Sequence, residues 1–347
     1  MLRVTPDLGP DWDSIAEDAP HTASSRWLRL AEDRLPGSLT FRHVSDGQTL
    51  VAMRGLLLLE PMGHEWLDPH LIASGGAVHL GLAAGGPHPW RGREPATLFP
   101  CLTLLYPNYD AFPVGPAVTD HAVLRRFLAE LSGWRVANGV SSAAFLYLTP
   151  EAMPLCEVLS ADGFHVFPIT TRAEMGVTWK DFDGYLATLS SKRRVSVRRE
   201  LRAISEAGVS VEVSELADVE GDLIPVRCML MAKYLGSARA DREARWFTRI
   251  REAFQADEIT VIVAKANGRT VAFSLFVRDG ACWTALLTGM DYGVSASRFS
   301  HFATMYYAPA EQAPLASVHR IFYGIGSQET KHFRGCSLTP LMAAVSP

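Results

Sequence analysis

Two consecutive tight turns constrain the second half of the chain more than any other feature. They are Asn267-Gly268 and Asp279-Gly280, and they separate three apolar segments at 259–265, 270–277 and 281–288. Dipeptides of this kind favour hairpins, because asparagine, aspartate and glycine tolerate the positive φ angles of a two-residue turn. Two such turns in succession predict a three-stranded antiparallel meander.

The first half carries a weaker form of the same signal. Alternating apolar residues over 39–60 flank Asp46-Gly47, which predicts a hairpin. We also expect a helix over 22–35 and an irregular loop, rich in Gly, Pro and His, over 61–96. Apolar runs and helical periodicity then predict strands and helices in alternation, at 97–106, 120–136, 143–148 and 150–161.

Comparable elements surround the meander in the second half. A strand over 171–179 leads into a basic helix over 183–207. The remaining predicted strands and helices are at 209–213, 219–235, 241–256, 298–308 and 318–323. Because both halves show helix, hairpin, further strand, helix and strand, we expect an α/β (α+β) fold of two similar fused modules. These would be residues 1–168 and 169–347, each a mixed, mostly antiparallel sheet flanked by helices.

The basic helix is a cationic island in an acidic chain. Ser190–Arg202 holds six basic residues and one acid, and without it the formal net charge of −4 would become −9. At roughly 100° per residue, Arg194, Arg198 and Arg202 share one face of a helix. A cationic row of this kind is either a platform for an anion or a solvated helix face. The apolar residues cluster on another face of the same helix: Leu186, Val197, Leu201 and Ile204.

A second polar cluster follows the last predicted strand. Gly324 and Gly326 begin like a dinucleotide-binding fingerprint, but Glu329 stands where the third glycine would be, and too few residues follow for such a domain. Polar groups at a strand end, on a backbone freed by glycine, are well placed to line a site. An ordinary polar turn is the alternative. The cluster consists of Glu329, Lys331, His332 and Arg334.

Several other classes of function lack sequence support. No apolar run approaches the ~20 residues of a membrane span, and the N-terminus has no signal-peptide organisation. The five cysteines lie more than fifty residues apart, which fits reduced thiols. We therefore expect a cytoplasmic protein. We expect no metal site either, because the loop histidines lack the i, i+4 spacing of a zinc helix: His64, His70, His79 and His88.

The basic helix and the C-terminal cluster together resemble a known family. The first motif reads Tyr185-Leu186-x3-Ser190-Ser191-Lys192-Arg193-Arg194-x3-Arg198-Arg199, and the second Gly324-x-Gly326-x2-Glu329-x-Lys331-x2-Arg334-Gly335. This pairing is similar to that of the FemABX-type transferases, which belong to the GNAT acyltransferase superfamily and contain two GNAT-like modules. The resemblance covers most of the chain and is weakest over residues 1–96. It implies two fused GNAT-like modules.

The resemblance also implies an activity. Family members transfer an aminoacyl group from aminoacyl-tRNA to an amine, often in peptidoglycan bridges. Relatives in natural-product pathways, such as the seryl transferase of valanimycin biosynthesis, use small amine or hydroxylamine acceptors. The long coiled-coil arm of some peptidoglycan-bridge enzymes is not evident in this sequence. We therefore expect aminoacyl-tRNA as donor, a small-molecule amine as acceptor and no bound cofactor.

The expected chemistry assigns roles to both motifs. Transfer of an ester to an amine passes through a tetrahedral oxyanion, which needs a cation or a hydrogen-bond donor. Lys331 is expected to supply that charge, while Glu329, His332 or Tyr323 assists proton removal. Phosphate groups of the donor are expected on basic side chains, since guanidinium groups suit phosphate: Lys192, Arg193, Arg194, Arg198, Arg199 and Arg334.

Two other functions remain open. One is an acyl-CoA-dependent N-acetyltransferase of the same superfamily, with acetyl-CoA as donor. Such an enzyme needs a Gly-rich pyrophosphate loop before the helix near 298, and residues 290–298 do not contain one. The other is a non-catalytic protein that binds RNA or a partner on the same scaffold.

Overall fold

The computed structural model describes residues 1–30, 32, 35–77, 87–295 and 298–346, and it divides into two compact units. Unit 1 is Met1–Arg172 together with the C-terminal segment from Thr339, and unit 2 is Ala173–Leu338. The sequence analysis placed the boundary after residue 168 and assigned the C-terminal segment to the second module. The segment groups with unit 1 because its strand pairs with a strand of that unit.

Unit 1 is built on a sheet with the strand order β1-β2-β3-β4-β5-β12. Its strands are β1 (Leu2–Thr5), β2 (Leu39–Ser45), β3 (Gln48–Leu58), β4 (Cys101–Leu104), β5 (Ser142–Leu148) and β12 (Ser337–Val345). The β4–β5 pair is parallel, while the β1–β2, β2–β3, β3–β4 and β5–β12 pairs are antiparallel. The predicted hairpin is confirmed, since Asp46 and Gly47 both adopt positive φ between β2 and β3.

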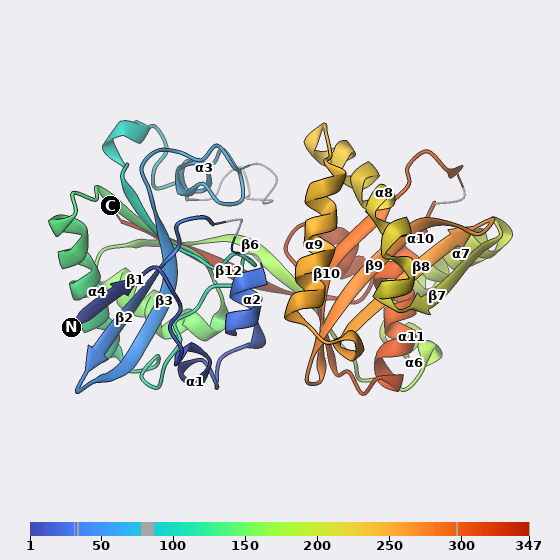
Figure 1. The fold of residues 1–347 in the computed structure, drawn as a ribbon, viewed down its shortest axis with the longest axis horizontal. Coiled ribbons are helices and arrows are strands. Elements are labelled where there is room, and N and C mark those ends of the chain that lie inside the picture. The colour runs from blue at the N-terminus through green and yellow to red at the C-terminus, as the bar shows by residue number, and fades with distance from the viewer. Residues whose placement is uncertain (31, 33–34, 78–86, 296–297, 347) are drawn as a thin grey trace. The chain divides into compact units, whose positions relative to one another are not determined.

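Helices α4 (His121–Ala137) and α5 (Met153–Ala161) lie in unit 1 close to their predicted positions (Figure 1). The carboxylate of Asp120 caps α4 by accepting from the amides of Ala122 and Val123. The helix predicted over 22–35 is shorter, because α2 spans Ser25–Leu30 and residues 31, 33 and 34 lie outside the described part. The long loop contains only one short α-helix among its described residues, α3 (Pro69–Ser74).

Unit 2 is built on a sheet with the strand order β6-β11-β10-β9-β8-β7. Its strands are β6 (His165–Gly176), which begins in unit 1, β7 (Val209–Ser214), β8 (Ile259–Ala266), β9 (Arg269–Asp279), β10 (Cys282–Met290) and β11 (Arg320–Gly324). The meander is confirmed, because β9 pairs antiparallel with both β8 and β10. In contrast, β11 pairs parallel with β10.

Helices cover both faces of this sheet. Phe273 of β9 contacts Phe247 of α9 (Ala240–Ala253), and the next residue, Ser274, contacts Thr304 of a π-helical segment (Ala303–Tyr307). Since successive residues of a strand point to opposite faces, α9 and the π-helical segment lie on opposite sides. The other helices of unit 2 are α6 (Phe182–Thr188), α7 (Ser191–Glu206), α8 (Leu216–Leu235), α10 (Ser300–Phe302), α11 (Ala308–Leu315) and α12 (Gln328–Phe333).

The basic helix predicted over 183–207 is wrong in one respect, because it is two helices. Leu189 and Ser190 have extended backbones, and they separate α6 from α7. Asp181 caps α6 through the amide of Gly184, and α7 starts afresh after Ser190. Leu186 therefore does not share the apolar face of Val197, which belongs to α7. Helix α12 and strand β12 were not predicted.

Candidate functional site in unit 2

The candidate site lies where two parallel strands separate. β10 and β11 pair only from Cys282–Thr284 to Arg320–Phe322, and a cavity of about 580 Å³ is lined by residues that follow on both strands. Both strands are irregular at this level. The register of β10 against β9 shifts between Ala285 and Leu287, and that of β11 against β6 shifts between Phe322 and Gly324. Such bulges redirect side chains and often occur beside active sites.

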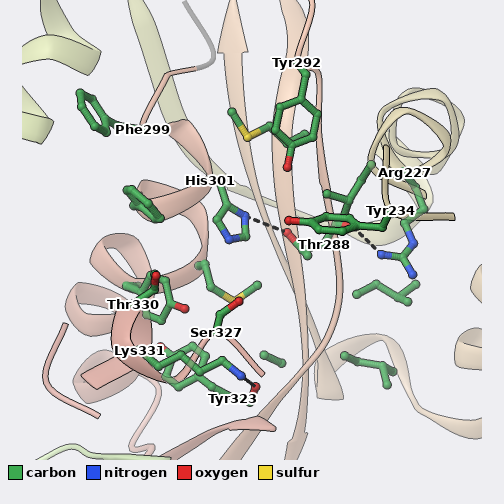
Figure 2. A pocket seen from close by; sticks show the side chains of 18 residues that line it. Arg227, Tyr234, Thr288, Tyr292, Phe299, His301, Tyr323, Ser327, Thr330 and Lys331 are labelled. Atoms are coloured by element: carbon green, nitrogen blue, oxygen red, sulfur yellow. Dashed lines mark hydrogen bonds between the residues drawn. The ribbon is translucent and has the colours of Figure 1, made fainter. Parts of the chain in front are cut away.

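The wall of the cavity is largely apolar and aromatic, with a few polar groups. Leu286, Met290 and Phe302 are among its apolar side chains. Figure 2 shows the polar groups that share the pocket: Arg227, Thr288, His301, Tyr323, Ser327 and Lys331. None of the described residues that line it is a carboxylic acid. This composition fits a neutral or anionic reacting group, held by a small number of directed polar contacts.

Lys331 lies in this wall and is buried, with 7% of its surface exposed. Its Nζ donates to the backbone carbonyls of Tyr323 (2.6 Å), Gly324 (3.1 Å) and Ile325 (2.8 Å). An ammonium group has three N–H donors, so these bonds use all of them. Burial lowers the pKa of Lys331 to about 8, so the side chain stays mostly charged at neutral pH.

The backbone held by Lys331 is the turn that ends β11. Gly324 and Gly326 have positive φ, and so does Ser327, at 47°. A non-glycine residue in that region is sterically costly and persists only where its surroundings fix it. The three bonds from Lys331 supply that constraint, and the turn brings Ser327 to the pocket wall. The Gly-x-Gly motif therefore serves to shape this turn.

Tyr323 lies at the level of the bulge in β11 and is 6% exposed. Its ring packs against Tyr306, with the ring centres 5.0 Å apart, and its hydroxyl oxygen is buried without a hydrogen-bond partner. Burial raises the pKa of this phenol well above its usual value, so the hydroxyl stays protonated. Tyr323 is therefore a hydrogen-bond donor aimed at the pocket side of the sheet, and it is unsuited to act as a base.

Arg334 has a different place from the one expected. It is 4% exposed, and its guanidinium donates to Glu200 of α7 (3.0 Å) and to the hydroxyl of Tyr307 (3.2 Å). It also stacks on Phe302, with its guanidinium carbon 3.4 Å from the ring centre. The expectation that Arg334 binds donor phosphate is corrected, because this arginine is already paired inside the unit.

Glu329 and His332 do not line the cavity. Both are exposed on α12, and the Nδ1 atom of His332 lies 3.2 Å from the carbonyl of Cys336. The structure therefore brings Lys331 and Tyr323 together and leaves Glu329 and His332 on the outer side of the same short helix.

The remaining basic side chains lie on α7. Lys192, Arg198 and Arg199 are exposed, and Arg193 and Arg194 are partly buried. Arg194 donates to the carbonyl of Leu189 at 2.5 Å, which ties it to the break before α7. Three of the expected phosphate ligands are thus open to solvent along one helix.

Three pocket residues were missed by the sequence analysis. His301 lies with its Nδ1 atom 3.3 Å from the hydroxyl of Thr288, and Arg227 donates to the backbone carbonyl of Thr288 at 2.9 Å. Arg227 also pairs with the buried Glu243. Burial, with the nearby cations of Arg334 and Lys331, lowers the pKa of His301 to about 4, so its ring is neutral at neutral pH. No local motif marks these residues, because they come from three separate elements.

The described residues contain no group of three or more His, Cys, Asp or Glu side chains that could hold a metal ion. His79 lies outside the described part of the chain. No helix in that part is both long enough and apolar enough to cross a membrane.

Comparisons with solved structures show the same fold. FemX is 9% identical, with a TM-score of 0.58 over 99% of this chain and 96% of FemX. L-PGS from Bacillus licheniformis is 12% identical, with a TM-score of 0.57 over 98% and 92%. A tandem GNAT protein from the clavulanic acid biosynthesis pathway is 11% identical, with a TM-score of 0.50 over 100% and 98%. These likenesses confirm the expected fold of two GNAT-like modules.

No curated protein matches the chain. The sequence profile of the FemAB-like family, described as peptidoglycan biosynthesis/recognition, matches residues 111–344. The matched region includes both motifs that carried the resemblance and every residue that lines the unit 2 pocket. The chain therefore belongs to the FemAB-like family.

Proposed function

We propose that the protein transfers an aminoacyl group from aminoacyl-tRNA to a small amine or hydroxylamine acceptor in the unit 2 pocket. The observation that carries this proposal is the packing of α7 on α12. The guanidinium carbon of Arg193 lies 5.7 Å from the ring centre of Phe333, two residues after Lys331. Phosphates held by the exposed cations of α7 would therefore lie close to the helix that contributes Lys331 to the pocket wall.

The pocket offers the groups that acyl transfer needs. The hydroxyl of Tyr323 would donate a hydrogen bond to the oxyanion that forms as the amine attacks the ester carbonyl. The N–H groups of Lys331 are committed to three carbonyls, so this residue would act through its positive charge and by fixing the turn that follows Tyr323. The family description and the likeness to FemX support a link to peptidoglycan, and the clavulanic acid protein supports a natural-product pathway.

The first experiment compares donors. The protein is incubated with a charged tRNA pool or with acetyl-CoA, and mass spectrometry follows candidate amines. Transfer from charged tRNA that disappears after RNase treatment is expected. Transfer from acetyl-CoA alone would overturn the proposed donor and favour the N-acetyltransferase. Absence of transfer from either donor, with RNA binding intact, would favour the non-catalytic binding protein.

A matched pair of variants tests the phosphate platform. Arg198→Ala/Arg199→Ala removes two adjacent exposed arginines from α7, whereas Arg125→Ala/Arg126→Ala removes two from α4 of unit 1. Each lost phosphate contact should lower the slope of log K against log salt by about 0.7 to 0.9. We expect the α7 variant to bind tRNA roughly tenfold more weakly with a flatter salt dependence. The α4 variant should behave as wild type, and equal effects would refute the assignment to α7.

A further inference from the structure

The proposed function leaves open which group takes the proton of the attacking amine. When an amine adds to an ester, its nitrogen becomes positively charged and must lose a proton before the product is stable. Tyr323 stays protonated, and Glu329 and His332 lie outside the pocket wall. The acceptor must therefore come from the residues that the sequence motifs did not mark.

The hydrogen bonds around His301 fix its tautomer. The Thr288 hydroxyl donates its only proton to the backbone carbonyl of Phe273, at 2.8 Å. It can therefore only accept from His301, so the Nδ1 atom of His301 carries the proton in their 3.3 Å contact. The Nε2 atom is left with a free lone pair. Figure 2 shows this second ring nitrogen turned away from Thr288, on the side of the view where Ser327 and Lys331 lie.

The ring is held in place by a chain of hydroxyl groups. Ser274 lies 3.5 Å from the hydroxyl of Thr288 and 3.1 Å from that of Thr304, with each distance measured between side-chain oxygens. These hydroxyls join β9, β10 and the π-helical segment behind the imidazole. A neutral imidazole whose Nδ1–H is anchored presents its Nε2 atom as an acceptor of defined direction.

The charged groups near His301 keep it neutral. Lys331 and Arg334 approach from α12 and the residue after it, and Arg227 from α8 lines the same cavity while paired with Glu243. The described lining residues include no carboxylate that would hold a proton on the ring. An imidazolium formed here would be a strong acid, so it would quickly pass its proton to a leaving group.

We propose that His301 is a catalytic residue whose Nε2 atom accepts the proton of the attacking amine. This inference rests on the proposed acyl transfer. The amine nitrogen bonds to the acyl carbonyl carbon, and its proton moves to Nε2. The bond between that carbon and the ester oxygen of the tRNA ribose breaks, and the ribose oxygen takes the proton from Nε2 as it leaves. The imidazole returns to its neutral form, so the step needs no further reactant.

The kinetic test uses His301→Gln, with His319→Gln as control, since His319 is exposed in unit 2 and does not line the pocket. With an alkylamine acceptor, kcat of His301→Gln should fall about 10²-fold or more while tRNA binding is unchanged. The loss should be much smaller with hydroxylamine, because the proton on its nitrogen is more acidic in the tetrahedral intermediate. His319→Gln should keep wild-type rates. Retention of kcat with the alkylamine, or equal losses with both acceptors, would overturn the proposal.

A second measurement does not depend on activity. Nitrogen-15 NMR of histidine-labelled protein identifies the His301 signals as those missing from His301→Gln. The expected result is a neutral ring with the proton on Nδ1 at neutral pH, and a changed tautomer balance in Thr288→Val. A proton on Nε2, or an imidazolium, would overturn the proposal. If the wild type used acetyl-CoA instead of charged tRNA, the donor assignment would fail while both tests of His301 remained decisive.

Discussion

Each unit contains a parallel strand pair, and the chain treats the space beyond the two pairs differently. In unit 1, the segment after β4 returns to the sheet, where Ala111 bridges to Leu148 of β5 and Val114 bridges to Ala52 of β3. In unit 2, β10 and β11 separate and a cavity of about 580 Å³ remains. The same strand arrangement is thus a sealed core where the chain fills it and a pocket where it does not.

Buried tyrosines show the same contrast. In unit 1, the hydroxyl of Tyr106 donates to the carbonyl of Phe112 at 2.7 Å, and that of Tyr147 donates to the carbonyl of Trp66 at 2.6 Å. In unit 2, the hydroxyl of Tyr323 has no partner. A buried polar group without a partner costs stability, so its presence beside a cavity indicates that a ligand satisfies it.

The largest expected effect compares the buried ion pairs of the two units, Arg334–Glu200 in unit 2 and Arg172–Asp110 in unit 1. Glu200→Met strands an arginine that cannot lose its charge, so it should lower the free energy of unfolding by roughly 3–5 kcal/mol. Arg172→Met should cost less, because burial already raises the pKa of Asp110 and the carboxyl can become neutral.

Urea denaturation between pH 5 and 8 measures both variants. A carboxyl whose pKa is raised in the folded state stabilises the protein more at low pH and loses that contribution as pH rises. The cost of Arg172→Met should therefore shrink as the pH falls, while that of Glu200→Met should not. Equal costs with the same pH dependence would remove the distinction between the two pairs.

Lys331 should give the next largest effect. Lys331→Met removes a positive charge from the pocket and frees three carbonyls, and transfer should fall by about 10²–10³-fold. Because burial lowers the pKa of Lys331 to about 8, the charged form is lost above that value, and the wild-type rate should fall as pH rises through 8. Steady-state kinetics from pH 6 to 9 checks both points. Lys180→Met, at an exposed lysine of unit 2, should leave the rate unchanged.

The smallest effect separates stability from activity in paired tyrosine variants. Tyr147→Phe strands the carbonyl of Trp66 and should cost about 1–3 kcal/mol of stability with no change in transfer. Tyr323→Phe removes a hydroxyl without a partner, so stability should be unchanged or slightly higher while transfer slows. Thermal unfolding and initial rates, measured on both variants, decide. A loss of stability in Tyr323→Phe would mean that its hydroxyl already has a partner.

Local patterns predicted the fold well where the signal was short-range. The turns at Asp46-Gly47 and Asn267-Gly268 fixed both hairpins, since their φ requirements are local. The break at Leu189 was not predicted, because α6 and α7 each satisfy helical periodicity and the interruption depends on tertiary packing. The site was predicted in part. Lys331 and Tyr323 follow one strand, whereas His301 and Thr288 meet only when β10 and α10 are folded together.

The position of β12 has a consequence for synthesis of the chain. This strand pairs with β5, and just beyond it the backbone carbonyl of Ser346 accepts from the indole of Trp90 at 3.0 Å. A ribosome makes β12 only after all the rest of unit 2. Until then, the β5 edge of unit 1 lacks its β12 neighbour and can pair with other chains. The half of the protein that is translated first is therefore completed last, and truncation before residue 337 would expose that edge permanently.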